Sequence, residues 1–195
     1  MVNHEFAVDA LVETCAALSG DNVERAAEIV CTKYPHRPPI EKRKSFAKNK
    51  QIEIFMRDGF IDRYSGERLL YPGAVHVLTQ MLPEVFPYQT NWKMTDCHQG
   101  WWNLFPSIDH VVSLAFGGTN DDDSLVCTSM KRNLAKSTSS LDEIGWKLYP
   151  PGKLDDWDGL TAWFLRYVDA HPQLLTNKDI SGWYDALKKF LDDKR

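Results

Sequence analysis

The strongest structural signal in the chain lies in residues 107–136, with the sequence SIDHVVSLAFGGTNDDDSLVCTSMKRNLAK. Residues 107–114, with apolar residues at 108, 111, 112 and 114, predict a strand, and the glycine- and aspartate-rich segment 117–123 predicts a loop. Residues 125–128 predict a second strand, and Ser129 suits the N-cap of a helix that continues to the end of the stretch. The order strand, loop, strand, helix therefore predicts a compact ββα unit.

Three side chains of this unit carry chemistry: Asp109, His110 and Asn133. Successive side chains of a strand point to opposite faces, so we expect Asp109 and His110 on opposite faces. A carboxylate and an amide oxygen, from Asp109 and Asn133, suit a hard cation such as Mg²⁺ or Mn²⁺. Histidine changes charge near neutral pH and suits a general base. The pattern predicts a metal site beside a base.

The same stretch resembles the HNH endonucleases, whose core is a ββα-metal finger. The resemblance rests on the Asp-His pair at 109–110, the Gly-Gly and acidic loop, the short second strand, and Asn-x-x-Lys at 133–136. Upstream, residues 57–66 (RDGFIDRYSG) resemble the segment that precedes the finger in that family. The resemblance covers roughly residues 55–137, with an insertion at 71–106.

The resemblance implies a role for each matching residue. His110 would be the general base that deprotonates water, and Asp109 and Asn133 would hold one Mg²⁺ or Mn²⁺ at the scissile phosphate. Ser124 stands at the position of the family's middle Asn and can still offer a backbone carbonyl to orient His110; Asn120 is the alternative for that role. The implied substrate is double-stranded DNA, cut to leave 5′-phosphate ends. A restriction or phage-defence role follows by analogy alone.

The cysteine pattern departs from the family, which often carries two Cys-x-x-Cys pairs around a structural zinc. The corresponding positions here are Asp62 with Ser65, and Ser129 with Arg132. Because none of these is a thiol, we expect no structural zinc. The cysteines that are present are scattered, and we expect reduced, mostly buried thiols. They are Cys15, Cys31, Cys97 and Cys127.

The charge distribution suggests where phosphates would bind. The formal net charge is −4, but residues 37–50 contain six bases and one acid, a local charge of +5. A basic stretch on an acidic body can contact phosphates locally, although a solvated linker is the alternative interpretation. The candidate phosphate contacts are Lys131, Arg132, Lys136, Arg37, Lys42, Arg43 and Lys44.

Helical periodicity extends on both sides of the ββα unit. The expected helices lie near 8–18, 23–34, 48–58, 74–82, 157–169 and 177–192. We expect one compact unit with an N-terminal helical hairpin and basic linker at 1–50, the nuclease core at 51–140 and a C-terminal helical extension at 141–195. The expected fold class is α+β, with a ββα-metal (HNH) core flanked by the N-terminal hairpin and the C-terminal helices.

Composition narrows the remaining classes. The chain has 195 residues, of which 43% are hydrophobic and 26% charged, as in ordinary globular domains. Its apolar runs are too short for a membrane span, and the first residues lack the pattern of a secretory signal, so we expect a cytoplasmic protein without a membrane partner. Two alternatives stay open, namely a non-catalytic nucleic-acid-binding module on an HNH scaffold and a nuclease for RNA or single strands. The oligomeric state also stays open, with the C-terminal amphipathic helix as one candidate dimer face.

Overall fold

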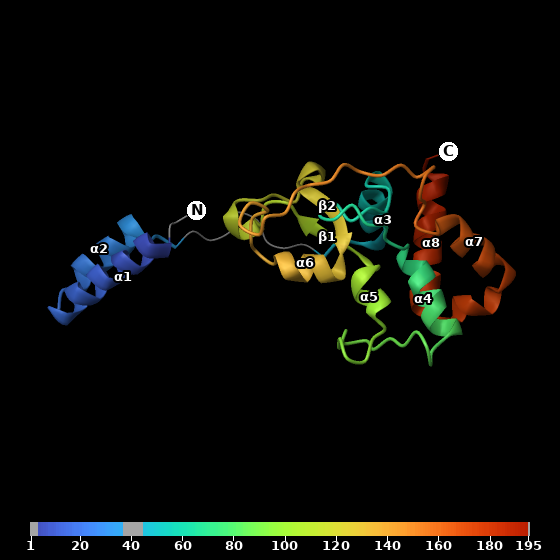
Figure 1. Cartoon of the computed structure of the whole chain (residues 1–195), viewed down its shortest axis with the longest axis horizontal. Helices are drawn as coiled ribbons and strands as arrows, with labels where there is room; N and C mark the ends of the chain where they lie inside the picture. Colours follow the sequence, from blue (N-terminus) through green and yellow to red (C-terminus); the bar gives the residue numbers. More distant parts are fainter. Residues whose placement is uncertain (1–3, 37–44, 195) are drawn as a thin grey trace. The chain divides into compact units, whose positions relative to one another are not determined.

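The computed structural model describes residues 4–36 and 45–194 (Figure 1). From the sequence we expect one compact unit, whereas the contacts divide the chain into Met1–Pro39 and Ile40–Arg195. The reason is that the two N-terminal helices pack mainly on each other. Within the described ranges, no helix is long and apolar enough to cross a membrane.

The first unit is the helical hairpin that the periodicity predicts. It consists of α1 (His4–Ser19) and α2 (Val23–Lys33), joined by a short turn that makes the helices antiparallel. The Asn22 side chain accepts the Arg25 N–H and caps α2. Lys33 and Glu13 form an ion pair across the hairpin at 2.6 Å.

The second unit is α+β, a set of helices with a small two-stranded antiparallel sheet. Its longer elements are α3 (Lys48–Arg57), α4 (Pro72–Met81), α5 (Gln99–Asn103), β1 (Pro106–His110), β2 (Leu125–Ser129), α6 (Met130–Lys136), α7 (Thr161–Ala170) and α8 (Lys178–Asp192). Its short 3-10 helices are η1 (Leu114–Phe116), η2 (Asp122–Ser124) and η3 (Pro172–Thr176).

The two strands pair with Pro106 opposite Ser129 and His110 opposite Leu125. β1 ends at His110, four residues earlier than the strand predicted at 107–114. The difference has a local cause, because the Ser113 side chain accepts the Ala115 N–H and starts η1, which turns the chain away from the sheet. Ser129 caps α6, as predicted, by accepting the Arg132 N–H.

The two faces of this sheet are covered by different helices. Ile108 packs against the main core, to which α3 contributes Ile52 and Phe55. Ser107 and Asp109 point to the other face, where they contact side chains of α6. The alternation of side chains along β1 therefore sends Asp109 and His110 to opposite faces, as expected.

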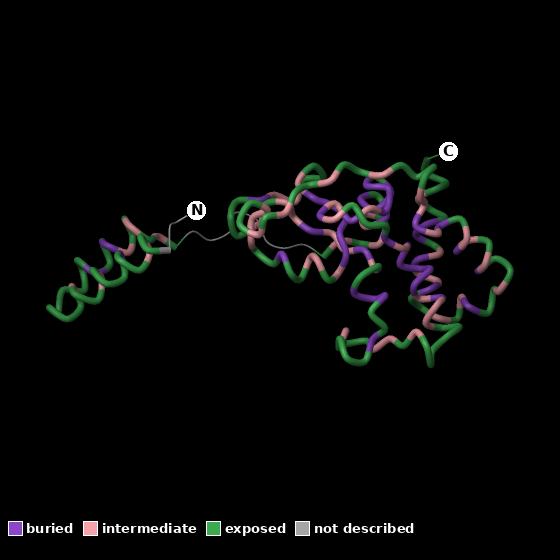
Figure 2. The backbone as a smooth tube through the Cα atoms, viewed as in Figure 1, coloured by how far each residue is buried: buried purple, intermediate pink, exposed green. Residues whose placement is uncertain are grey.

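The main core joins α3, α4, α7, α8 and β2 (Figure 2). Phe55, Phe60 and Tyr71 stand at its centre and have no exposed surface. The apolar face of α8, with Ile180 and Leu187, is buried in this core. Packing within the chain therefore accounts for the amphipathic pattern that made α8 a candidate dimer face.

The segment between α4 and β1 lies in the insertion, is largely irregular and rich in aromatic residues, and contains the short helix α5. Trp101 is fully buried and stacks on Tyr88 and Phe105, at ring-centroid distances of 4.0 and 5.2 Å. His76 of α4 touches the same cluster, 4.9 Å from the Trp101 ring.

Ser140 and Glu143 form the reciprocal bonds of a capping box, and turns rather than a helix follow them. One predicted helix boundary needs correction. The next helix, α7, begins at Thr161 and not near 157, because the Asp158 carboxylate accepts the N–H groups of Leu160 and Ala162.

Candidate active site

Asp109 lies at the end of β1, with only 8% of its surface exposed. Its Oδ2 accepts the Tyr64 hydroxyl at 2.7 Å and lies 2.9 Å from Nζ of Lys136. Burial and the neighbouring Asp109 carboxylate raise the pKa of Tyr64, so this hydroxyl stays protonated and donates. Both contacts use Oδ2.

Lys136 has no exposed surface, which corrects its assignment as a phosphate contact. Its Nζ pairs with Asp109, donates to the carbonyl oxygen of His110 at 2.8 Å and lies 5.7 Å from the centre of the Tyr64 ring. Lys136 lies three residues after Asn133 on α6, so helical geometry turns both toward the sheet. The lysine links the helix to the Asp109–His110 pair instead of to solvent.

His110 is half-buried on the opposite face, with its ring centroid 6.3 Å from that of Phe46. Its Nε2 lies 3.1 Å from Oδ1 of Asn120. An amide oxygen can only accept, so this contact places the ring proton on Nε2. The lone pair of the neutral ring is then on Nδ1, which is the atom suited to take a proton.

Of the two residues expected to orient His110, the structure brings Asn120 to the ring. The Ser124 carbonyl, which we expected to orient His110, instead accepts the Val111 N–H at 3.0 Å. The Ser124 hydroxyl lies 2.9 Å from that of Thr119. The Ser124 carbonyl therefore extends the hydrogen bonding between β1 and β2 by one residue beyond His110 and closes the loop that joins the two strands.

Asn133 is held against β1 by the nitrogen end of its amide. Nδ2 donates to Oγ of Ser107 at 2.6 Å and to the carbonyl of Ile108 at 3.0 Å. These bonds fix the rotation of the amide and leave Oδ1 as the end that can serve as a ligand. Asn133 and Asp109 thus belong to the same face of the sheet, the one covered by α6.

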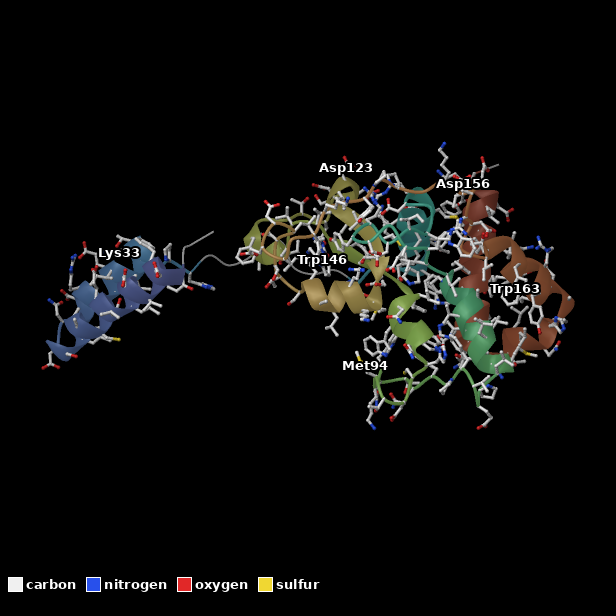
Figure 3. The ribbon with its side chains drawn as sticks, viewed as in Figure 1. Lys33, Met94, Asp123, Trp146, Asp156 and Trp163 are labelled. Atoms are coloured by element: carbon white, nitrogen blue, oxygen red, sulfur yellow. The ribbon has the colours of Figure 1, made fainter. Side chains whose placement is uncertain are left out.

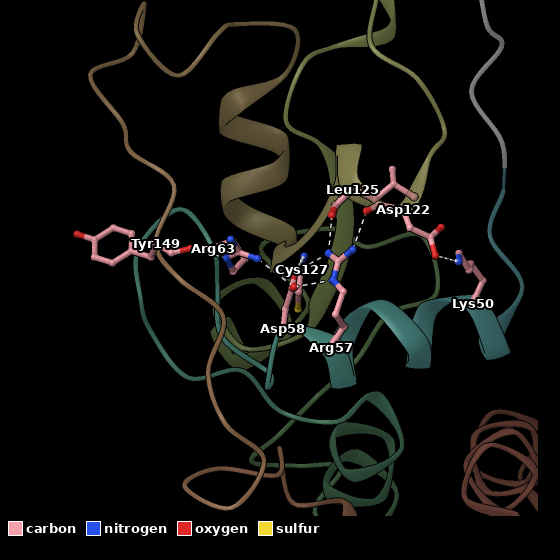
Figure 4. Close-up of polar contacts among 8 residues, drawn as sticks. All are labelled: Lys50, Arg57, Asp58, Arg63, Asp122, Leu125, Cys127 and Tyr149. Atoms are coloured by element: carbon pink, nitrogen blue, oxygen red, sulfur yellow. Dashed lines mark hydrogen bonds and ion pairs between the residues drawn. The ribbon is translucent and has the colours of Figure 1, made fainter. Parts of the chain in front are cut away.

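A second network holds the loop that carries Asn120 (Figure 4). Arg57 donates to the carbonyls of Asp122 and Leu125, both at 2.6 Å. The fully buried Asp58 accepts from Arg57 and Arg63 and from the Cys127 N–H. Arg57, Asp58 and Arg63 thereby fasten the end of α3 and the turn after it to β2 and to the loop before β2.

Asp62, Ser129 and Arg132, three of the four positions that the resemblance to HNH endonucleases would align with zinc-binding cysteines, meet around the carboxylate of Asp62. The buried Asp62 accepts the Ser129 N–H and the Thr128 hydroxyl, each at 2.9 Å, and lies 3.7 Å from Nε of Arg132. Ser65, the fourth position, donates its N–H to the Asp62 carbonyl. Hydrogen bonds and an ion pair link the turn after α3 to the start of α6.

The remaining phosphate candidates differ in position. Lys131 is exposed, and Arg132 is half-exposed, 5.3 Å from the ring of Trp146 (Figure 3). Both line a hollow of about 460 Å³ beside α6, together with Asn103 and Glu67. Arg37, Lys42, Arg43 and Lys44 lie outside the described residues.

Tyr64 and Asp58 are site-supporting residues that the sequence analysis missed. Tyr64 lies 45 positions from Asp109, and only its aromatic character in a turn could have singled it out. Asp58 belongs to the Arg-Asp-Gly segment already quoted, whose resemblance to the family was the available signal. The cysteines also differ from expectation, since Cys15 and Cys31 are exposed and only Cys97 and Cys127 are buried.

In the described part of the chain, no group of three or more His, Cys, Asp or Glu side chains is arranged to hold a metal ion. The metal site expected from the sequence uses one carboxylate, from Asp109, and one amide, from Asn133, so it is not a group of this kind. Comparisons with protein-family models, with curated proteins and with solved structures found no match for this chain.

Proposed function

We propose that the chain is a metal-dependent HNH endonuclease that hydrolyses phosphodiester bonds of double-stranded DNA. The observation that supports this most is the contact that Asn120 makes with the ring of His110. Its Nε2 is engaged by Asn120, and its Nδ1 keeps the lone pair, at the end of a strand that also carries Asp109. A base so prepared suits the deprotonation of water beside a phosphate.

The donor set fits one Mg²⁺ or Mn²⁺. Asp109 offers Oδ1 and Asn133 offers Oδ1, and both are hard oxygen donors of the kind these ions prefer. Asn133 is already oriented by Ser107 and Ile108. When bound, the ion would neutralise charge that develops on the phosphate and on the leaving oxygen. Asp109 and Asn133 would hold it.

Each remaining residue has a defined task in this proposal. His110 takes the proton of the attacking water at Nδ1, and Asn120 holds the ring through Nε2. Lys136 and Tyr64 hold the Asp109 carboxylate in place by charge and by a hydrogen bond. The carboxylate therefore loses little conformational entropy when it binds a ligand. Lys131 and Arg132, at the hollow beside α6, are placed for flanking phosphates.

A restriction or phage-defence role remains an analogy with small stand-alone HNH proteins. The recognition of a sequence would have to come from outside the ββα unit, because phosphate contacts carry no base information. The insertion at 71–106 and the basic stretch at 37–50 are the segments that we propose for it.

The direct test is cleavage of supercoiled plasmid and linear duplex with Mg²⁺ or Mn²⁺, with EDTA as control and with single-stranded DNA and RNA alongside. We expect duplex DNA to be cut only with metal, and His110→Ala to lower the rate roughly 10²-fold or more, the usual scale of general-base catalysis. His36→Ala, at an exposed histidine, serves as the matched control and should cut at the normal rate.

Binding should be measured with Ca²⁺ in place of Mg²⁺, so that a loss of cleavage can be separated from a loss of affinity. If His110→Ala cuts as fast as the parent, the assignment of the base is wrong. If DNA is bound but never cut with any divalent ion, the chain is a binding module. If RNA or single strands are cut in preference, the substrate class is wrong.

A further inference from the structure

The N-terminal hairpin contributes small residues to the contact between its own helices. The α1 positions that face α2 are Ala7, Ala10, Thr14 and Ala17, which are the less exposed positions of that helix. The hairpin thus has a narrow contact, in which α2 adds Ala26 and Ile29. Two short helices with so little buried surface are not stable by themselves.

Five apolar residues of α1 form an exposed stripe that points away from α2. They are Val8, Leu11, Val12, Cys15 and Leu18, at the i, i+3, i+4, i+7 spacing of a buried helix face. Val12 has 62% of its surface exposed. A helix normally buries such a stripe, so in α1 the face that the sequence makes apolar is not the face that α2 covers.

α2 repeats this arrangement with Val23, Ala27, Cys31 and Tyr34, all exposed. At 3.6 residues per turn, the exposed stripe of each helix lies roughly 110° from its contact face, in the same rotational sense. Antiparallel helices reverse that sense in space, so both stripes lie on one side of the hairpin. We call this continuous apolar surface the hairpin face; in Figure 2 both helices are mostly exposed.

We propose that the hairpin face binds the hairpin face of a second copy of this chain, giving a four-helix bundle at the centre of a homodimer. The nine side chains of the face carry no charge, which disfavours nucleic acid as the occupant. Six of the nine have 41–67% of their surface exposed, so the face approaches the size of a standard stable interface, which buries roughly 800 Å² per partner. Two identical two-helix faces related by a twofold axis make a four-helix bundle.

The test is the molar mass of the full-length protein by light scattering across micromolar concentrations. We expect twice the 22.4 kDa of one chain. The double variant Val12→Glu/Val23→Glu should be a monomer with an unchanged circular dichroism spectrum. Val85→Glu is the matched control, since Val85 is 68% exposed but lies outside the hairpin, and it should stay dimeric.

Thiol reactivity gives an independent readout, because both exposed cysteines, Cys15 and Cys31, belong to the hairpin face. Cys127 is buried, and burial raises the pKa of its thiol, so it should not react in the folded protein. Alkylation of Cys15 should be slow in the dimer and fast in the double variant. A monomeric parent overturns the proposal, as does a dimer that survives the double substitution. Neither readout depends on nuclease activity, so the two proposals can fail separately.

Discussion

The ammonium group of Lys136 lies 2.9 Å from the carboxylate of Asp109, and the lysine has no exposed surface. Removing two opposite charges from water is tolerated only if the two groups stay paired and their remaining polar atoms are hydrogen-bonded. Lys136 also donates to the His110 carbonyl, and Asp109 also accepts from Tyr64. The pair therefore connects α6, β1 and the turn after α3 at the position of the proposed chemistry.

Replacing Lys136 with methionine should lower the free energy of unfolding by about 3–5 kcal/mol, because a buried carboxylate loses its counter-charge. Urea unfolding measures this loss. Lys131→Met is the matched control on the exposed side of the same helix, with an expected change within about 0.5 kcal/mol. The double variant Asp109→Asn/Lys136→Met should regain part of the loss, since the unpaired charge is gone. A Lys136→Met protein as stable as the parent would show that the pair does not support the fold.

Asn120→Ala should slow DNA cleavage roughly 10- to 100-fold, the usual effect of removing a group that orients a functional side chain. The physical reason is the loss of the acceptor at Nε2 of His110, which frees the ring to rotate and to change tautomer. DNA affinity measured with Ca²⁺ should not change. In an His110→Ala background, the Asn120 substitution should add nothing, because the group that it orients is absent.

Ser124→Ala is the control for this prediction. Its carbonyl bond to Val111 is made by the backbone and survives the substitution, while only the hydroxyl contact with Thr119 is lost. Cleavage close to the parental rate is therefore expected. If Asn120→Ala cut DNA at the parental rate, the Asn120 contact at Nε2 would not be what orients His110.

The parts of this fold that sequence could predict are those set by local rules. Helical periodicity located α2 and α8 closely, and the N-cap residue Ser129 located the start of α6. The alternation of side chains along a strand was enough to separate Asp109 from His110. These features depend on neighbours within one or two turns, which the sequence displays directly.

The parts that sequence could not predict depend on distant partners or on burial. From the sequence alone, Lys136 on α6 is expected to extend into solvent, as lysines usually do. It turns inward because the buried carboxylate of Asp109 lies beside it. β1 ends at His110 because Ser113 starts a 3-10 turn. The apolar residues on both sides of Ser113 instead favour a longer strand, so the sequence does not reveal this end. Tyr64 reaches Asp109 from another part of the chain, and no local pattern marks it.

Asp62→Ala should lower the free energy of unfolding by at least about 2 kcal/mol, because buried donors lose their acceptor. Those donors are the N–H groups of Tyr64 and Ser129 and the hydroxyl of Thr128. Glu67→Ala is the control: Glu67 lies 3.6 Å from Arg132 but is largely exposed, so its removal should cost no more than about 0.5 kcal/mol. Equal losses for the two variants would contradict a structural role for the Asp62 network.

EDTA should leave unchanged the thermal unfolding midpoint of the protein purified without added metal. The turn after α3 and the start of α6 are joined by the Asp62 carboxylate, not by thiolates, so chelation removes nothing from this junction. Differential scanning calorimetry with and without EDTA measures the midpoint. Elemental analysis supplies the decisive counter-result, since one zinc per chain in protein purified without added metal would refute the expectation of no structural zinc.

His76 predicts a specific loss of stability in acid. Its ring is enclosed by Tyr88, Trp101 and Phe105, and this burial lowers the pKa to about 4 from the usual 6.5. Of the two charges that act on it, Asp179 raises the pKa and Lys48 lowers it. The folded-state pKa is depressed, so the contribution to stability is complete above the unfolded pKa and is lost as the pH falls from 6.5 toward 4.

Over that range the free energy of unfolding should fall by up to about 3 kcal/mol through this residue, from the 1.36 kcal/mol carried by each pKa unit. Urea unfolding at about pH 7 and about pH 5 measures the slope. His76→Gln removes the titrating group, so the variant should lose less stability than the parent between the two pH values, even if it is weaker at both. If parent and variant lost the same stability between the two pH values, His76 would not bind a proton more readily in the unfolded chain than in the folded one, and the prediction would be wrong.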